Sequence, residues 1–193
     1  QFYDNFTPWD STIGLSVLES KSDLFLNSLV SNDSLTQNSA EKSFNIIEFE
    51  DEDAPKIIST IGKTHNLKNG LTVREELIDA LGKLKNPRIL PFLESSYIAV
   101  GDTVKLQLAI LKAIANQKTK KATKSFVELI KSNTPIPNEE GDVYPIFHPF
   151  YDTLALTQHL YPKMLLLSIL PEYKSATYAL LSRAIDSNQY KKR

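Results

Sequence analysis

Few residues in this sequence have both a reactive side chain and the spacing expected of a catalytic or metal-binding site. His148, Asp152 and His159 would share one face of a helix, as metal ligands or an acid–base pair would. At a rise of ~1.5 Å per residue the two histidines lie ~16 Å apart, whereas zinc ligands lie ~2 Å from the ion. They therefore cannot share an ion on one helix. We interpret His148, directly before Pro149, as a helix cap or turn residue.

Ser39 and Lys42 match the S-x-x-K spacing in which a lysine activates a serine nucleophile. That chemistry also needs a K-T-G strand, and the nearest match, Lys63-Thr64-His65, lacks the glycine. The chain contains no cysteine, which excludes disulfides, thiolate metal sites and a cysteine nucleophile. Phosphate-binding glycine loops, zinc-protease motifs and EF-hand loops are also missing. We therefore predict no catalytic, cofactor-binding or metal-binding residues and a chain that is not an enzyme.

Lysines gather between residues 105 and 131, where a basic ridge could follow phosphates. The whole chain has only four arginines, however, and residues 102–134 contain a single aromatic, Phe126. Reading base edges favours arginine, and binding single strands favours stacked aromatics. We interpret the lysines mainly as a solvated helix face and do not expect nucleic acid as the partner. Weak binding to a phosphate backbone is the alternative interpretation.

Aromatic residues concentrate near the two ends of the chain, at Phe2, Tyr3, Phe6 and Trp9 and again from Tyr144 to Tyr178. They either seal the ends of a helical stack or form a contact surface, and both interpretations stay open. The candidate binding surface comprises Arg74, Lys105, Lys112, Lys120, Lys121, Lys124, Tyr144 and Tyr151.

Composition and charge set wider limits on function. The 193 residues are enough for one domain, and a net charge of −1 gives no general signal for nucleic acid or an acidic membrane. Apolar runs are far shorter than the ~20 residues that a membrane-spanning helix needs, so we expect no membrane insertion. Because the sequence starts with Gln1, we expect either a domain of a larger protein or a processed product. The cytoplasm and the bacterial envelope are both compatible locations.

Helical periodicity dominates the chain and predicts about nine or ten helices. Thr72 and Glu75 form a capping-box pattern, and Asn86-Pro87 has the pattern of a helix start. The segment from Thr103 to Asn116 is apolar around most of its circumference and should have neighbours on several sides. Residues 31–39 are predicted to be a loop, 43–50 a helix or a short strand, and 133–146 irregular. Helices are predicted over 8–20, about 24–30 (after Ser22 and Asp23), 72–84, 87–98, 103–116, 120–132, 149–160, 162–170 and 172–188.

Two sequence patterns recur at an offset of 31 or 32 residues. Asp53-Ala54-Pro55 with Ile57 is echoed by Lys85-Asn86-Pro87 with Ile89, and Val73-Arg74 with Leu77 is echoed by Val104-Lys105 with Leu108. Alternating matches at nearly one period indicate successive helix–turn–helix units.

The segment VREELIDALGKLKNPRILPFL, Val73 to Leu93, resembles HEAT repeats of the phycobilisome-lyase type. The similarity rests on the Val-Arg helix start, the Ala80-Leu81-Gly82 step with Leu84, the Asn86-Pro87 turn and the Leu90-Pro91 step. It implies a right-handed α-α superhelix and no particular chemistry. We accordingly predict one all-α solenoid over 1–193, with an N-terminal cap over 1–38, HEAT-like repeats over 39–132 and a C-terminal repeat or cap over 133–193.

The predicted function is a non-catalytic module for protein–protein interaction or scaffolding, with an unidentified protein partner. Its binding ridge would be lined by the second helix of each pair. The repeat resemblance and the pair His148 and Asp152 motivate a different hypothesis, a module associated with a lyase or hydrolase.

Overall fold

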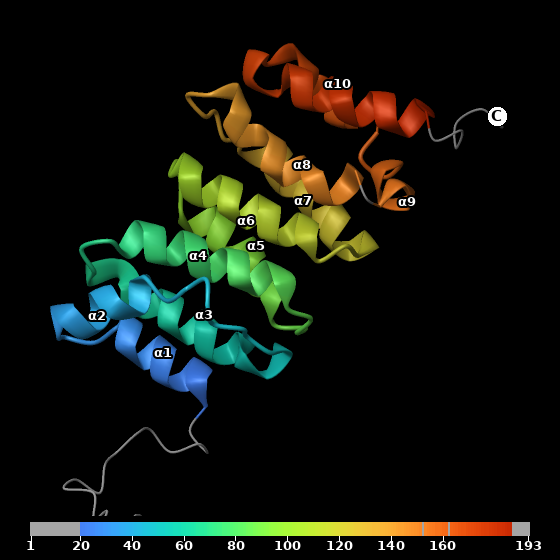
Figure 1. Cartoon of the computed structure of the whole chain (residues 1–193). Coiled ribbons are helices and arrows are strands. Elements are labelled where there is room, and N and C mark those ends of the chain that lie inside the picture. The colour runs from blue at the N-terminus through green and yellow to red at the C-terminus, as the bar shows by residue number, and fades with distance from the viewer. Residues whose placement is uncertain (1–19, 152, 162, 187–193) are drawn as a thin grey trace, which may run out of the picture. The chain divides into compact units, whose positions relative to one another are not determined.

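The computed structural model describes residues 20–151, 153–161 and 163–186, and every regular element among them is a helix (Figure 1). The predicted all-α class is therefore confirmed for these residues. Among them, no helix is both long enough and apolar enough to cross a membrane. Nearly all of the predicted helix over 8–20, the four N-terminal aromatics and Asp152 lie outside the described residues.

The chain divides into two compact units, residues 1–48 and 49–193. The first contains α1 (Lys21–Leu29) and α2 (Ser34–Glu41). The second contains the remaining elements, which are η1 (Asp51–Asp53), α3 (Ala54–Lys63), η2 (Thr64–Asn66), α4 (Gly70–Lys83), α5 (Ile89–Ala99), α6 (Val104–Asn116), α7 (Lys120–Ser132), η3 (Glu140–Val143), α8 (Tyr144–Tyr151), α9 (Leu154–Thr157), η4 (Lys163–Ile169) and α10 (Pro171–Asp186). Whether the two units form one continuous solenoid stays a prediction.

In the first unit, α1 and α2 pack against each other. Phe25 of α1 is buried and meets Phe44 edge to face, with 4.9 Å between ring centroids. The loop predicted over 31–39 is wrong, because α2 begins at Ser34. The Asp33 carboxylate accepts hydrogen bonds from the Thr36 amide at 2.9 Å and the Thr36 hydroxyl at 2.5 Å. This cap stabilises a helix whose polar sequence alone favours a loop. Residues 43–50 form turns and irregular chain instead of a helix or strand.

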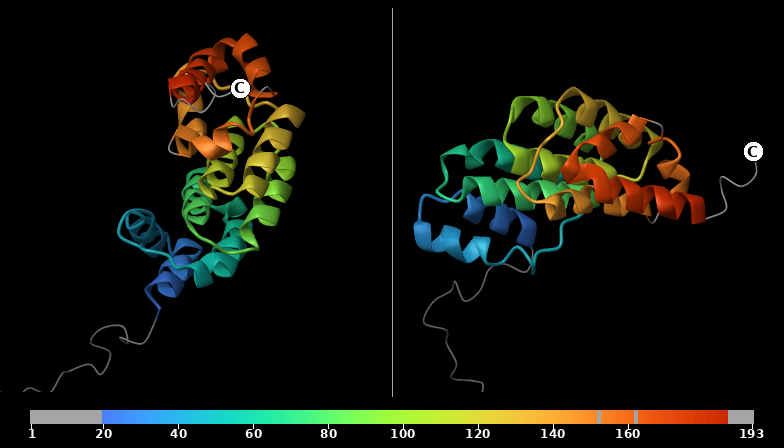
Figure 2. Two further views of the ribbon diagram at one scale, coloured as in Figure 1. Left: turned by 90° about the vertical axis from the view of Figure 1, so that its right-hand side faces the viewer. Right: turned by 90° about the horizontal axis from the view of Figure 1, so that it is seen from above.

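The second unit has two layers of helices. Helices α4, α6 and α8 lie side by side in one layer, and α5 and α7 contact each other in the other (Figures 1 and 2). Helix α6 contacts α4, α5, α7 and α8, so the prediction of neighbours on several sides is confirmed. Its buried residues are Leu106, Gln107, Ile110, Leu111, Ala113, Ile114 and Ala115.

Gly82 marks the closest approach of α4 to α6. A Cβ atom at this position would lie 2.8 Å from the Ala113 Cα and 3.1 Å from the Ala113 Cβ. The glycine of the Ala80-Leu81-Gly82 step is therefore explained by packing between helices, since any side chain would push the two backbones apart.

Hydrogen bonds connect segments about one repeat apart along the second unit. Lys85 donates its backbone N–H to the Asp51 carboxylate at 2.6 Å, and Ser125 donates its hydroxyl to Glu94 at 2.5 Å. Gln117 donates to the backbone oxygen of Gly82 at 3.1 Å. These pairs are 31 to 35 residues apart in sequence, close to the predicted period of 31 or 32.

The predicted capping box at the start of α4 does not form, because the helix begins two residues earlier, at Gly70. The Gly70 amide closes a turn by donating to the Leu67 oxygen at 3.1 Å. Any Cβ at Gly70 would lie 2.2 Å from the Thr64 oxygen, so only glycine fits in this turn. Helix α5 begins at Ile89. In the turn before it, the Asn86 side chain accepts a hydrogen bond from the Arg88 amide at 3.1 Å.

The prediction that His148 is a cap or turn residue is wrong, because His148 and Pro149 lie inside α8. Pro149 removes one backbone hydrogen bond, but the helix also buries Phe147 and Phe150. Their ring centroids lie 6.0 and 5.1 Å from that of Phe126. We infer that this aromatic packing outweighs the missing bond. The predicted helix over 149–160 is instead divided between α8 and α9, and 162–170 corresponds to the 3₁₀ helix η4.

Candidate functional site

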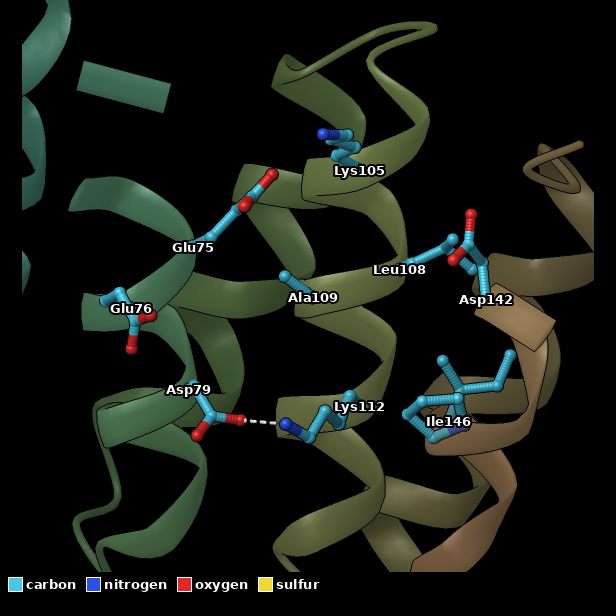
Figure 3. Close-up of a pocket in the computed structure, with 10 residues that line it drawn as sticks. Glu75, Glu76, Asp79, Lys105, Leu108, Ala109, Lys112, Asp142 and Ile146 are labelled. Carbon is cyan, nitrogen blue, oxygen red and sulfur yellow. Dashed lines mark ion pairs between the residues drawn. The ribbon is translucent and has the colours of Figure 1, made fainter. Parts of the chain in front are cut away.

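A groove of about 390 Å³ lies across α4, α6 and the start of α8 (Figure 3). We call it the charged groove. Its lining residues are Glu75, Glu76 and Asp79 from α4, Lys105, Leu108, Ala109 and Lys112 from α6, and Asp142, Pro145 and Ile146 from the η3–α8 segment. Four carboxylates and two ammonium groups therefore surround an apolar centre.

Asp79 organises the positive charges in this groove. Its carboxylate lies 2.5 Å from the Lys112 ammonium and 3.0 Å from the Lys83 ammonium. Burial raises the pKa of the Asp79 carboxyl, but the hydrogen bonds and charges of Lys112 and Lys83 lower it by more, so the net pKa lies below its ordinary value of 3.8. A carboxylate held in its ionised form in this way is a poor proton carrier near neutral pH and a good structural link between α4 and α6.

Glu75 lies one turn before Asp79 and is less well satisfied. Its Oε1 atom is buried and has no hydrogen-bond partner among the described residues. Burial raises the pKa of the Glu75 carboxyl above its ordinary value of 4.5, and the nearby Lys105 ammonium only partly opposes that rise. Figure 3 shows Glu75 and Asp79 on α4 facing Lys105 and Lys112 on α6.

Leu108, Ala109 and Ile146 supply the apolar centre, and Asp142 stands on the side opposite α4 (Figure 3). This arrangement suits an extended segment that carries an apolar side chain flanked by basic ones. Within the described ranges, no group of three or more histidine, aspartate or glutamate side chains is arranged to hold a metal ion.

The predicted candidate Arg74 lies in a different cavity, of about 350 Å³, which we call the apolar pocket. Helices α3, α4, α5 and α6 and the neighbouring turns line it, mostly with aliphatic and aromatic side chains. The residues are Ile58, Ile61, Gly62, His65, Arg74, Ile78, Phe92, Ser96, Ala99, Val100, Thr103, Leu106 and Ile110.

Lys120 and Lys124 lie in a third cavity, of about 310 Å³, together with Val127, His159 and Lys163. The structure thus brings His159 close to the α7 lysines. Lys121 is exposed on the same helix and does not line this cavity. The lysines between 105 and 131 are therefore divided between separate cavities, and their binding to phosphate stays a prediction.

The two candidate tyrosines both lie on α8. Tyr144, at its first residue, is partly exposed beside the charged groove. Tyr151 donates its hydroxyl to the Ala176 oxygen at 3.4 Å, and Arg183 lies 5.7 Å from its ring centroid. Tyr151 therefore connects α8 to α10, and the choice between aromatics that seal a stack and aromatics that form a contact surface stays a prediction. His148 is exposed with its ring 5.8 Å from that of Tyr151.

Comparison with protein families, curated proteins and solved structures finds no match to this chain. The resemblance to HEAT repeats therefore stays a prediction, supported only by the residues that carry it.

Lys105 and Lys112 were predicted from the sequence, whereas the carboxylates that face them were not. The signal was present, because Glu75 and Asp79 are four residues apart on one helix face, and Asp79 precedes Lys112 by about one repeat. Comparing charges at the repeat offset, instead of counting lysines along the chain, would have found this pairing.

Proposed function

We propose that this chain is a non-catalytic protein-interaction module, built as a right-handed superhelix of HEAT-like helix pairs. The charged groove is the observation that carries the proposal. It lies across α4, α6 and the start of α8, which lie side by side in one layer. In the proposed superhelix these are the second helices of successive pairs.

The repeat architecture is supported by packing between neighbouring segments. Hydrogen bonds join residues 31 to 35 positions apart, and Gly82 permits close contact between α4 and α6. In the proposed architecture, each helix pair of the second unit buries one face on the next pair, so the opposite faces remain available for a partner.

The charges of the charged groove indicate the kind of protein segment that would bind. Its lining carries four acidic and two basic residues, and Lys112 is already paired with Asp79. Glu76 is exposed, whereas Glu75 is partly buried. A segment with one apolar side chain and neighbouring lysine or arginine residues would complement both the apolar centre and the excess negative charge.

A displayed library of random twelve-residue peptides, selected on the 193-residue chain, tests this proposal. Selected peptides should be enriched in basic residues beside an apolar one. Glu76→Lys, which reverses one exposed charge in the groove, should weaken their binding by roughly tenfold, the effect of ~1.4 kcal/mol. Glu128→Lys is the matched control, since Glu128 is exposed on α7 and outside the groove. Equal binding to the Glu76→Lys variant and the wild type would refute the charged groove as the binding site.

A further inference from the structure

The apolar pocket has the features of a small-molecule site and is separate from the charged groove. Its volume of about 350 Å³ falls within the range of ligand pockets, ~300–1,000 Å³. Ile61, Ile78, Leu106 and Ile110 are buried and form its interior, while Ile58 and other lining residues are partly exposed. Such pockets typically combine an apolar interior with a few polar groups that orient the ligand.

Arg74 supplies a positive charge to this pocket, and no described carboxylate forms an ion pair with it. Its Nε donates a hydrogen bond to the Gly70 oxygen at 3.1 Å, and its Nη1 lies 3.4 Å from the Nδ1 of His65. A guanidinium has five N–H donors in a planar fork that fits a carboxylate. Several donors of this partly buried group therefore remain available to an anion.

The hydrogen bond to Gly70 also fixes where the charge lies. Gly70 is the first residue of α4, and any side chain there would clash with the Thr64 oxygen. This close contact with the preceding turn holds the Gly70 carbonyl in place. Arg74 is thus oriented by the backbone of its own helix, and His65, from the same turn, lies beside it. A preoriented guanidinium loses little conformational entropy when it binds a carboxylate.

We propose that the apolar pocket binds a small amphipathic carboxylate, whose apolar body fills the cavity and whose head group pairs with Arg74. At ~30 Å³ for each water-sized group, the cavity holds roughly a dozen such groups. A straight-chain acid of about ten carbons matches this size. Thr103 and Ser96, which also line the pocket, supply further hydroxyl groups.

The first test titrates the full 193-residue chain with decanoate below its micelle concentration, by isothermal calorimetry. Saturable one-to-one binding is expected. Arg74→Gln should weaken it by roughly tenfold to a hundredfold, because a charge-assisted hydrogen bond contributes ~1.5–3 kcal/mol. Arg88→Gln, at an exposed arginine that does not line the pocket, should leave it unchanged. Lack of saturable binding, or equal binding of decanoate to the Arg74→Gln variant and the wild type, would overturn the proposal.

The chemistry of the head group is tested separately with decan-1-ol and decylamine. Both share the apolar body of decanoate, but neither carries a negative charge. We expect each to bind the wild-type chain at least about tenfold more weakly than decanoate. Equal affinity for either compound would show that Arg74 does not select a carboxylate and would overturn the assignment.

A second variant tests the location of the site without touching Arg74. Gly62 lines the pocket, and a Cβ at this position would have no heavy atom within 4 Å. Gly62→Leu should therefore fold normally, place its side chain in the pocket and abolish decanoate binding, with folding checked by circular dichroism. If Arg74→Gln does not fold, this variant decides the question, and undiminished decanoate binding to folded Gly62→Leu would refute the site.

Discussion

Replacing Gly82 with alanine tests the close packing of α4 against α6. The added Cβ would lie 2.8 Å from the Ala113 Cα and 3.3 Å from the Ala113 oxygen, so the clash is with backbone that no side-chain rotation can relieve. Overpacking a core costs ~1–3 kcal/mol. Alanine in a helix recovers ~0.5–1 kcal/mol relative to glycine. We therefore expect a net loss of about 0–2.5 kcal/mol in the free energy of unfolding, which places Gly82→Ala ~1–3 kcal/mol below a helical glycine-to-alanine change without a clash.

Gly62→Ala is the matched control, because Gly62 is also helical but its Cβ would meet nothing within 4 Å. There only the helix propensity acts, and the free energy of unfolding should rise by about 0.5–1 kcal/mol. Urea denaturation followed by circular dichroism would measure both variants, with equal m-values required for the comparison. If Gly82→Ala raises the free energy of unfolding as much as Gly62→Ala does, the close approach of α4 to α6 is wrong.

Four further predictions concern other parts of the second unit. Lys118 has a backbone φ of 49°, so Lys118→Gly should raise the free energy of unfolding by about 1 kcal/mol, and a lower urea midpoint would contradict this. Tyr173 donates its buried hydroxyl to the Pro135 oxygen at 2.6 Å, so Tyr173→Phe should cost ~1–3 kcal/mol, and an unchanged thermal midpoint would argue against the bond. In the charged groove, the pKa of Asp79 is lower in the folded than in the unfolded chain, so ionised Asp79 stabilises the fold at pH values above 3.8. This stabilisation is lost as the pH falls through the lower pKa of the folded state. Asp79→Asn should therefore be less stable than the wild type at neutral pH, with the difference shrinking in acid. The raised pKa of Glu75 has the opposite effect, because the fold loses stability as the pH rises from 4.5 through the higher pKa of the folded state. Glu75→Gln should therefore be more stable than the wild type at neutral pH. Urea titrations at several pH values would check both, and parallel pH profiles for wild type and variants would contradict them.

The helices that could be predicted are those whose ends and apolar faces are both encoded locally. The prediction for 120–132 matches α7 because Thr119 caps the helix through the Ala122 amide, and the buried residues Phe126 and Ile130 recur at helical spacing. The segment 103–116 similarly matches α6 to within one residue. In both cases, short-range sequence contains the physical cause of the helix.

The errors arose where tertiary contacts outweigh local preference. Pro149 signals a helix boundary in sequence, but α8 continues through it because Phe147 and Phe150 pack on Phe126. For the candidate site, the individual lysines were visible in sequence, whereas the pairing of Lys112 with Asp79 depends on how α6 lies beside α4. The apolar pocket could not be predicted at all, because it joins side chains from four helices.

The side chain of Gln117 has a consequence for how such a chain can be shortened or lengthened. Its Nε2 lies 3.1 and 3.0 Å from the backbone oxygens of Gly82 and Leu84 at the end of α4, and 3.4 Å from the Leu81 oxygen, which also accepts the Leu84 amide. A chain cut just before Gln117 would leave the Gly82 and Leu84 oxygens without this donor, although every residue of α4 would still be present. Deletions and grafts that retain α4 should therefore also retain Gln117, and a cut after α6 should fall beyond Gln117 and not at the helix boundary Asn116.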